Sequence, residues 1–215
     1  MGRSVLVVGL GRFGSAAAIE LMRMGHEVLA VDNDAVRVNR IAPQVTHAME
    51  LDASDDAALR SIGVGDFDHA IIAISSATET SIFATMAVKM LGVGNVVAKA
   101  GSELHGAILE RVGADRVVYP EREMGTRVSH VLGLPNVIDY LDVAPHFGLV
   151  RIRLPDAQVG RTLAEIDLVG RYGLTPIALR RGDRVTVIPH RDERIGANDE
   201  LILLGRDERL ERIFE

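Results

Sequence analysis

Residues 4–14 read Ser4-Val-Leu-Val-Val-Gly-Leu-Gly-Arg-Phe-Gly14, and this stretch decides the fold. An apolar run that ends at a glycine predicts a buried strand, and the apolar positions that follow at helical spacing predict a helix. Between the two lies the pattern G-x-G-x-x-G, formed by Gly9, Gly11 and Gly14. In this setting the first glycine permits a tight turn, the second lets a pyrophosphate approach the backbone, and the third lets helix and strand pack closely.

The same alternation of strand and helix continues after the motif. Further strands are predicted over residues 27–31, 46–50, 69–74, 95–100 and 115–119, and helices over 34–41, 55–62, 79–91 and 103–112. Strands that alternate with helices form a parallel sheet covered on both faces, because each crossover needs a helix to return the chain. The sequence therefore predicts an α/β fold, a doubly wound parallel sheet of the Rossmann type.

The pattern changes after the sixth strand. A helix over 123–132 carries one apolar stripe and ends at Gly133-Leu-Pro135; we expect the stripe to pack on a partner chain, with packing on its own sheet as the alternative. Strands over 150–154, 174–179, 185–188 and 200–204, with helices over 162–168 and 207–214, predict a smaller α+β domain. The expected domains are residues 1–134 and 135–215. The apolar stripe of the helix over 123–132 consists of Met124, Val128, Val131 and Leu132.

Composition excludes several classes of function. With 24 Lys and Arg against 30 Asp and Glu, the net charge is −6, so we expect no nucleic-acid partner. The chain has no cysteine, which excludes disulfides, thiolate nucleophiles and Cys-based metal sites. No segment is long and apolar enough for a signal peptide or a membrane span, and we expect a cytoplasmic protein with no direct membrane insertion.

The glycine motif and Asp32 together predict a site for an adenine nucleotide. A helix start of this kind offers N–H groups to a phosphate, and Asp32, at the end of the second strand, can accept hydrogen bonds from both ribose hydroxyls. A carboxylate there also argues against a 2′-phosphate. The alternative is that the glycines serve packing alone.

Other polar residues fall at the same edge of the sheet. Arg12, inside the loop, can reach a terminal phosphate, or it is a solvated surface arginine. Asp52 and the pair Ser75-Ser76 follow the third and fourth strands, where such sheets bind ligands; capping of the next helices explains them nearly as well.

The C-terminal part offers no ordered set of His, Lys and Tyr side chains for proton transfer, and its only histidines are His146 and His190. A dehydrogenase is therefore the weaker hypothesis, and we expect no enzymatic activity. A nucleotide that is bound and not consumed acts as a signal.

Beyond the glycine motif, several segments share a familiar pattern: 5–14, 31–34, 51–55, 97–99, 113–121, 173–181 and 198–205. Together they resemble the RCK (regulator of potassium conductance) proteins, above all the single-copy cytosolic KtrA/TrkA-like subunits. The resemblance covers nearly the whole chain, with an N-terminal RCK (TrkA-N) domain followed by a C-terminal RCK (TrkA-C) domain.

The resemblance implies a regulatory subunit that binds ATP, ADP or NAD(H) and gates a membrane potassium channel or transporter. It implies a homodimer formed through the helix after strand six, an octameric ring, and a KtrB/TrkH-like potassium-translocating partner at the inner face of the cell membrane.

Residue by residue, Arg12 matches the arginine that senses the ATP γ-phosphate, Asp32 matches the ribose acid, and Lys99 stands where many members carry arginine. Glu121 matches an acidic position that in some members binds a divalent or sodium ion near the nucleotide, and Mg²⁺ and Ca²⁺ are the divalent candidates here. The expected nucleotide-binding residues are Gly9, Gly11, Arg12, Phe13, Gly14, Asp32, Asn33, Asp52, Ala53, Ser75, Ser76 and Lys99.

Some members bind cyclic di-AMP between paired C-terminal domains. The matching stretch, residues 166–177, has Thr175-Pro176 where Asn is usual, and its arginine spacing differs. The sequence therefore leaves this ligand open. Two alternatives to a nucleotide-sensing subunit also stay open: an NAD-dependent oxidoreductase or NAD(H)-responsive redox sensor, and a dimerisation scaffold with a vestigial pocket.

Overall fold

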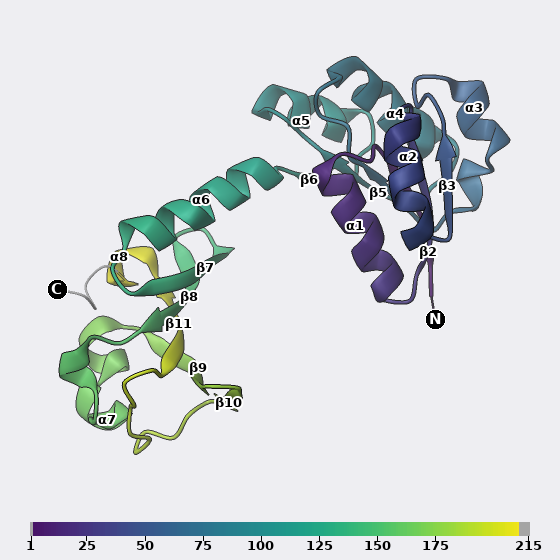
Figure 1. Ribbon diagram of the computed structural model, residues 1–215. Coiled ribbons are helices and arrows are strands. Elements are labelled where there is room, and N and C mark those ends of the chain that lie inside the picture. The colour runs from purple at the N-terminus through teal and green to yellow at the C-terminus, as the bar shows by residue number, and fades with distance from the viewer. Residues whose placement is uncertain (1, 211–215) are drawn as a thin grey trace. The chain divides into compact units, whose positions relative to one another are not determined.

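The computed structural model describes residues 2–210. The chain forms two compact units, residues 1–120 and residues 121–215, which are shown in Figure 1 and treated separately below. The helix expected to close the first domain belongs by its contacts to the second unit, whereas the expected boundary lay at 134/135.

The first unit is a six-stranded parallel sheet in the order β3-β2-β1-β4-β5-β6. The predicted α/β class and doubly wound architecture are confirmed, and the order of the strands reverses between β1 and β4. The strands are β1 (Ser4–Val8), β2 (Glu27–Asp32), β3 (His47–Glu50), β4 (His69–Ile72), β5 (Asn95–Lys99) and β6 (Arg116–Val118). The helices are α1 (Arg12–Arg23), α2 (Ala35–Ile41), α3 (Asp56–Ser61), α4 (Thr78–Met90) and α5 (Glu103–Arg111), with 3₁₀ turns η1 (Ala42–Gln44) and η2 (Val64–Asp66).

Each face of this sheet has its own core. Strand residues alternate between faces, so Val5 and Val7 of β1 pack with α1 and α2, while Leu6 and Val8 pack with α3, α4 and α5. All four of these β1 side chains are at least 98% buried. The continuous apolar run of β1 is therefore explained by helices that cover both faces of the sheet, as predicted.

Side-chain caps fix where most helices of the first unit begin. The Asp34 carboxylate accepts the N–H groups of Val36 and Arg37 at the start of α2, so Asp34 is the N-cap predicted there. Asp55 caps α3 and Ser102 caps α5 in the same way. By contrast, the N-cap residues of α1 and α4 are Gly11 and Ala77, and neither helix has a side-chain cap.

The second unit contains α6 and a five-stranded antiparallel sheet in the order β10-β9-β11-β8-β7. Its core gathers apolar residues of the strands with Leu163, Ile166 and Leu168, and Val131 of α6 packs against it. The predicted smaller α+β domain is confirmed. Its elements are α6 (Pro120–Gly133), β7 (Val137–Ala144), β8 (Phe147–Arg153), η3 (Asp156–Gln158), α7 (Leu163–Ile166), the π-helical turn η4 (Leu168–Tyr172), β9 (Thr175–Arg181), β10 (Arg184–Val187), β11 (Glu200–Arg206) and α8 (Asp207–Leu210).

Strand β7 was not predicted from the sequence. It pairs with β8 through the two-residue turn Pro145-His146, and the register shifts twice along the pair. The terminal helix was predicted over 207–214; α8 accounts for its start, and residues 211–214 lie outside the described residues. Across residues 2–210, no helix has the length and apolarity to cross a membrane.

The stripe expected on α6 divides between two environments. Val131 packs on the core of the second unit, and His130 stacks on the Tyr140 ring with centroids 3.8 Å apart. Met124, Val128 and Leu132 are exposed. Val131 thus packs on the unit that follows the helix, a contact that neither expectation named.

Candidate functional site

The strand order reverses between β1 and β4. Ligands of doubly wound sheets bind at such a switch point, beside the carboxyl ends of the strands, and we refer to this edge as the crevice. The glycine loop follows β1, Asp32 ends β2, and Ser75 follows β4. The two helices that start here, α1 and α4, are also the two of α1–α5 without a side-chain cap. Their first-turn N–H groups are therefore left for another acceptor.

The three glycines of the motif differ in what their surroundings allow. Gly9 has φ = 94°, a conformation that favours glycine. A Cβ on Gly14 would lie 1.8 Å from the Gly9 carbonyl oxygen, so close packing excludes any side chain. Gly11 has φ = −68°, which any residue adopts, and a Cβ there would meet nothing within 4 Å. Neither packing nor backbone conformation requires glycine at position 11.

Asp32 is buried and organises the loop. One carboxylate oxygen accepts the Leu10 N–H at 2.5 Å, and the other accepts the Asp34 N–H at 2.9 Å. Arg37 of α2 approaches the same carboxylate at 3.4 Å and also pairs with Asp34 at 3.3 Å. A carboxylate has about four lone-pair positions, so capacity for a hydroxyl donor remains.

Arg37 was not singled out from the sequence. Its position five residues after a strand-ending aspartate, in the first turn of the next helix, is the signal that could have found it.

Phe13 and Lys99 come together from distant parts of the sequence. Lys99 ends β5 and is buried, and its ammonium lies 5.9 Å from the centroid of the Phe13 ring at the start of α1. Because β4 lies between β1 and β5, this cation–π pair reaches across the crevice. It places a positive charge and an aromatic ring at the edge where a nucleotide is expected.

Arg12 is the first residue of α1 and is exposed. No ion pair holds its guanidinium within residues 2–210, whereas Arg23 at the other end of the helix is paired with Glu20 at 2.6 Å. The Arg12 side chain can therefore turn toward an anion at the loop without breaking an existing contact.

The remaining expected residues lie at the same edge. Asp52 follows β3, where Ser54 donates two hydrogen bonds to its carboxylate and keeps the pKa of Asp52 below its ordinary value. Asp55 caps α3, so Asp52 has no capping role. Ser75 and Ser76 likewise do not cap α4, whose N-cap residue is Ala77. Asn33 is exposed after β2, and Ala53 is buried.

His105 is a further residue near this edge that the sequence did not indicate. It is buried in α5, its Nδ1 accepts the Gly101 N–H at 3.3 Å, and its Nε2 has no hydrogen-bond partner. Burial lowers the pKa of the ring. Gly101 in turn lies against the Ser75 carbonyl, so the histidine supports the loop after β5.

No group of three His, Cys, Asp or Glu side chains in residues 2–210 is placed to hold a metal ion. Glu121, expected as a cation ligand, lies in the first turn of α6, and its role stays a prediction.

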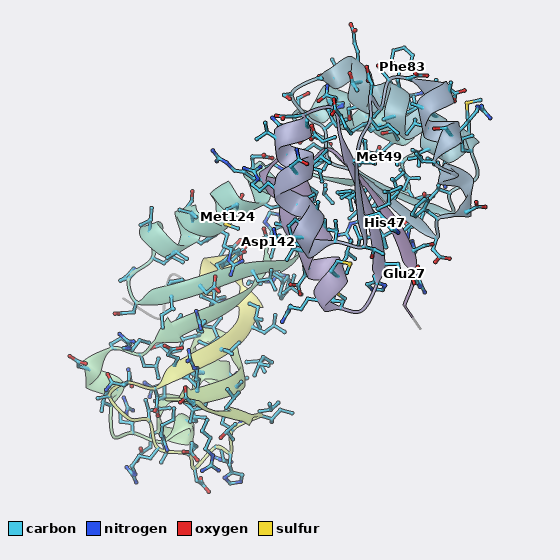
Figure 2. All side chains as sticks on the ribbon, turned by 45° about the vertical axis from the view of Figure 1, so that its right-hand side comes forward. Glu27, His47, Met49, Phe83, Met124 and Asp142 are labelled. Carbon is cyan, nitrogen blue, oxygen red and sulfur yellow. The ribbon has the colours of Figure 1, made fainter. Side chains whose placement is uncertain are left out.

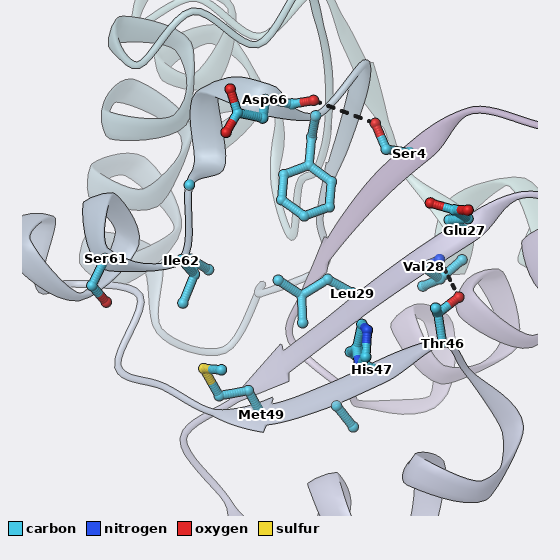
Figure 3. A pocket seen from close by; sticks show the side chains of 13 residues that line it. Ser4, Glu27, Val28, Leu29, Thr46, His47, Met49, Ser61, Ile62 and Asp66 are labelled. Atoms are coloured by element: carbon cyan, nitrogen blue, oxygen red, sulfur yellow. Dashed lines mark hydrogen bonds between the residues drawn. The ribbon is translucent and has the colours of Figure 1, made fainter.

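Two further cavities lie elsewhere. One, of about 700 Å³, is lined by Leu29, Met49, Ile62 and Phe67 near the amino ends of β2 and β3 (Figure 3), and so lies away from the glycine loop. The other, of about 400 Å³ in the second unit, includes Val169 and Pro176 from the stretch compared with cyclic di-AMP sites.

Comparison with known proteins agrees with this division of the chain. The model of the TrkA-N domain matches residues 5–120, and that of the TrkA-C domain matches residues 149–215. Ktr system potassium uptake protein C of Bacillus subtilis (strain 168) is 38% identical over 205 residues, which cover 95% of this chain and 93% of the relative. Ktr system potassium uptake protein A of the same organism is 32% identical, over 96% of this chain and 93% of the relative.

Solved structures share the fold. The RCK domain of GsuK superposes with a TM-score of 0.69 at 17% identity, over all of this chain and 48% of that chain, so the chain spans about half of its length. The GsuK channel bound to NAD gives a TM-score of 0.66 at 18% identity, over 98% of this chain and 38% of that chain. The resemblance to RCK proteins predicted from the sequence is confirmed.

Proposed function

The chain belongs to the family of TrkA-N and TrkA-C domain proteins that includes the Ktr potassium uptake proteins, and from this premise we propose that it is a cytoplasmic regulatory subunit that senses a nucleotide and gates a membrane potassium-translocating subunit.

One observation carries the nucleotide part of this proposal. Gly11 is glycine although neither its φ nor its packing requires it, and the space where a Cβ would stand is open. Gly11 is the N-cap residue of α1, and close approach of a pyrophosphate to the backbone accounts for a glycine at that position. The uncapped starts of α1 and α4 beside the crevice, and Asp32 at the end of β2, support the same ligand.

ATP and ADP are distinguished in this proposal by Arg12. Its guanidinium, which forms no ion pair within residues 2–210, can form charge-assisted hydrogen bonds with a γ-phosphate that ADP lacks. Lys99 supplies a second cation in the same crevice. NAD(H) is the other candidate, and Mg²⁺ or Ca²⁺ bound with help from Glu121 would offset the charge of the phosphates.

Assembly follows from two exposed apolar stripes. Met124, Val128 and Leu132 on α6 would form a homodimer, as expected from the sequence. Phe83, Met86 and Met90 form a second stripe on α4, from which Phe83 projects outward (Figure 2). Apolar patches of this kind mark protein contacts. Dimers joined through α4 would build the octameric ring that we propose under the transport subunit.

Gating then rests on a population shift. A ring with two shapes responds to a nucleotide only as far as the two shapes bind it with different affinity. If ATP engages Arg12 in one shape alone, a coupling of about 1–3 kcal/mol per site is typical, and the copies in a ring add their contributions.

The test is a thermal-shift panel of ATP, ADP, AMP, NAD, NADH and cyclic di-AMP, each with and without Mg²⁺ or Ca²⁺. At 100 times its dissociation constant a ligand adds about 2.7 kcal/mol, which for a chain of this size raises the melting temperature by roughly 5–10 °C. We expect ATP to bind more tightly than ADP, and Arg12→Ala to weaken ATP binding about tenfold or more while ADP binding is kept.

Arg40→Ala, an exposed arginine at the end of α2, is the matched control and should leave both affinities unchanged. Equal affinities of the wild-type protein for ATP and ADP would remove Arg12 as the discriminator. Steady NADH consumption with a small substrate would indicate the oxidoreductase, and no shift with any nucleotide would indicate a scaffold.

A further inference from the structure

A hollow of about 330 Å³ in the second unit is lined by three arginines, Arg171, Arg206 and Arg209, together with Phe147. All three guanidinium side chains are exposed. The hollow lies within one unit and has no part in the nucleotide crevice of the first.

The fold brings these residues together at one end of the antiparallel sheet. Phe147 begins β8 and is the direct cross-strand partner of Arg206, which ends β11. Arg209 lies on α8, the helix that directly follows β11, and Arg171 lies on η4. Buried leucines on either side of these positions hold the segments in the core of the unit: Leu168, Leu174 and Leu210.

The three arginines have no acidic partner within residues 2–210. Other arginines of the second unit do: Arg151, Arg153 and Arg180 all approach Glu200, and Arg181 pairs with Asp199. The carboxylate next to Arg206, Asp207, accepts the Tyr140 hydroxyl at 2.8 Å instead. Three like charges therefore face one hollow on a chain of net charge −6, and an anion bound there would offset their mutual repulsion.

One of the cations is already positioned. The Arg206 guanidinium carbon lies 5.2 Å from the centroid of the Phe147 ring, a cation–π contact that restricts the side chain. A guanidinium held in this way loses less conformational entropy when it binds an anion than a free one does.

We propose that this hollow is a binding site for the phosphate group of a small soluble anion. Guanidinium groups match phosphate oxygens with paired hydrogen bonds, and three of them supply the charge that a di- or triphosphate requires. A volume of about 330 Å³ has room for a phosphate or pyrophosphate group. The site shares Val169 with the neighbouring cavity at Pro176 and Arg191 but takes its cations from different elements.

Isothermal titration of the full chain with sodium pyrophosphate, at low ionic strength and without nucleotide, tests the proposal. We expect a saturable site, and dissociation constants raised about tenfold or more by Arg206→Ala and by Arg171→Ala. Arg206→Lys should reduce the affinity for pyrophosphate by less than Arg206→Ala does, because lysine keeps the positive charge but lacks the paired N–H donors of a guanidinium. Arg184→Ala, an exposed arginine of β10 with no acidic partner among the described residues, is the control and should bind like wild type.

Pyrophosphate could also bind at the glycine loop, so Arg12→Ala is titrated in parallel. Binding that is lost in Arg12→Ala and kept in Arg206→Ala would overturn the proposal, as would equal losses in Arg206→Ala and Arg184→Ala or no binding at millimolar pyrophosphate. Failure here leaves the nucleotide site untouched, because the two sites use different arginines.

Discussion

At the scale of single residues, the glycine motif separates packing from ligand binding. A methyl group at Gly11 meets open space, so Gly11→Ala should leave the melting temperature of the free protein unchanged within about 2 °C and still weaken nucleotide binding about tenfold or more. In Gly14→Ala the methyl group would meet the Gly9 carbonyl oxygen, and the fold itself should lose stability. Thermal unfolding without ligand and titration with the best nucleotide of the panel measure both effects.

Opposite results would reverse the assignment. If Gly11→Ala binds nucleotide like wild type, the loop is shaped for packing alone and the crevice is vestigial. Thermal stability of the unliganded variant is the control, since a loss of affinity counts only while the variant remains folded.

The same scale shows what the sequence could and could not predict about the site. Gly9, Gly14 and Asp32 were predictable because their chemistry is tied to one strand–turn–helix unit. The pairing of Phe13 with Lys99 was not, because it depends on how the β1 loop and the end of β5 meet across β4. The binding roles of the expected residues stay predictions until a nucleotide is measured.

At the scale of elements, the Arg181–Asp199 contact fastens the end of β9 to the turn before β11. The Asp199 side chain is 3% exposed and accepts hydrogen bonds from Arg181 Nε at 2.9 Å, Nη2 at 2.7 Å, and the Gly196 N–H at 2.7 Å. The guanidinium holds the pKa of Asp199 below its ordinary value. Arg181→Ala should therefore cost about 1.5–3 kcal/mol of unfolding free energy at pH 7.

The pH dependence of this cost has a definite sign. A carboxylate whose folded pKa is lowered contributes its stability above its unfolded pKa of about 3.9, and the contribution disappears as the pH falls through the lower folded value. Chemical denaturation should show wild type and Arg181→Ala converging below about pH 4. A difference that stays constant from pH 7 to pH 3 would mean that Arg181 acts through packing, and Arg184→Ala serves as the exposed control.

Elements were predictable where the hydrophobic period was regular. The alternating strands and helices of the first unit follow directly from this period. Strand β7 was not predicted, for two physical reasons. Register shifts after Val137 and after Asp142 interrupt its two-residue period. Its hairpin turn, Pro145-His146, has no glycine or asparagine, and His146 itself adopts φ = 63°.

At the scale of the whole molecule, the two apolar stripes predict assembly in two separable steps. A charge placed in the α4 stripe, as in Phe83→Glu, should block contacts between dimers and leave a species of two chains. A charge in the α6 stripe, as in Val128→Glu, should break the dimer, and the double variant should be monomeric. Val36→Glu, at an exposed position of α2 outside both stripes, is the control.

Light scattering coupled to size exclusion distinguishes masses of one, two and eight chains at micromolar concentration. Two different surfaces are necessary because a single twofold contact closes on itself and stops at the dimer. A wild-type protein that runs as a monomer would contradict both steps and would also weaken the gating proposal, since a ring multiplies a small coupling per site and a monomer cannot. If Phe83→Glu instead yields monomers, the homodimer forms through α4 of the first unit and not through α6.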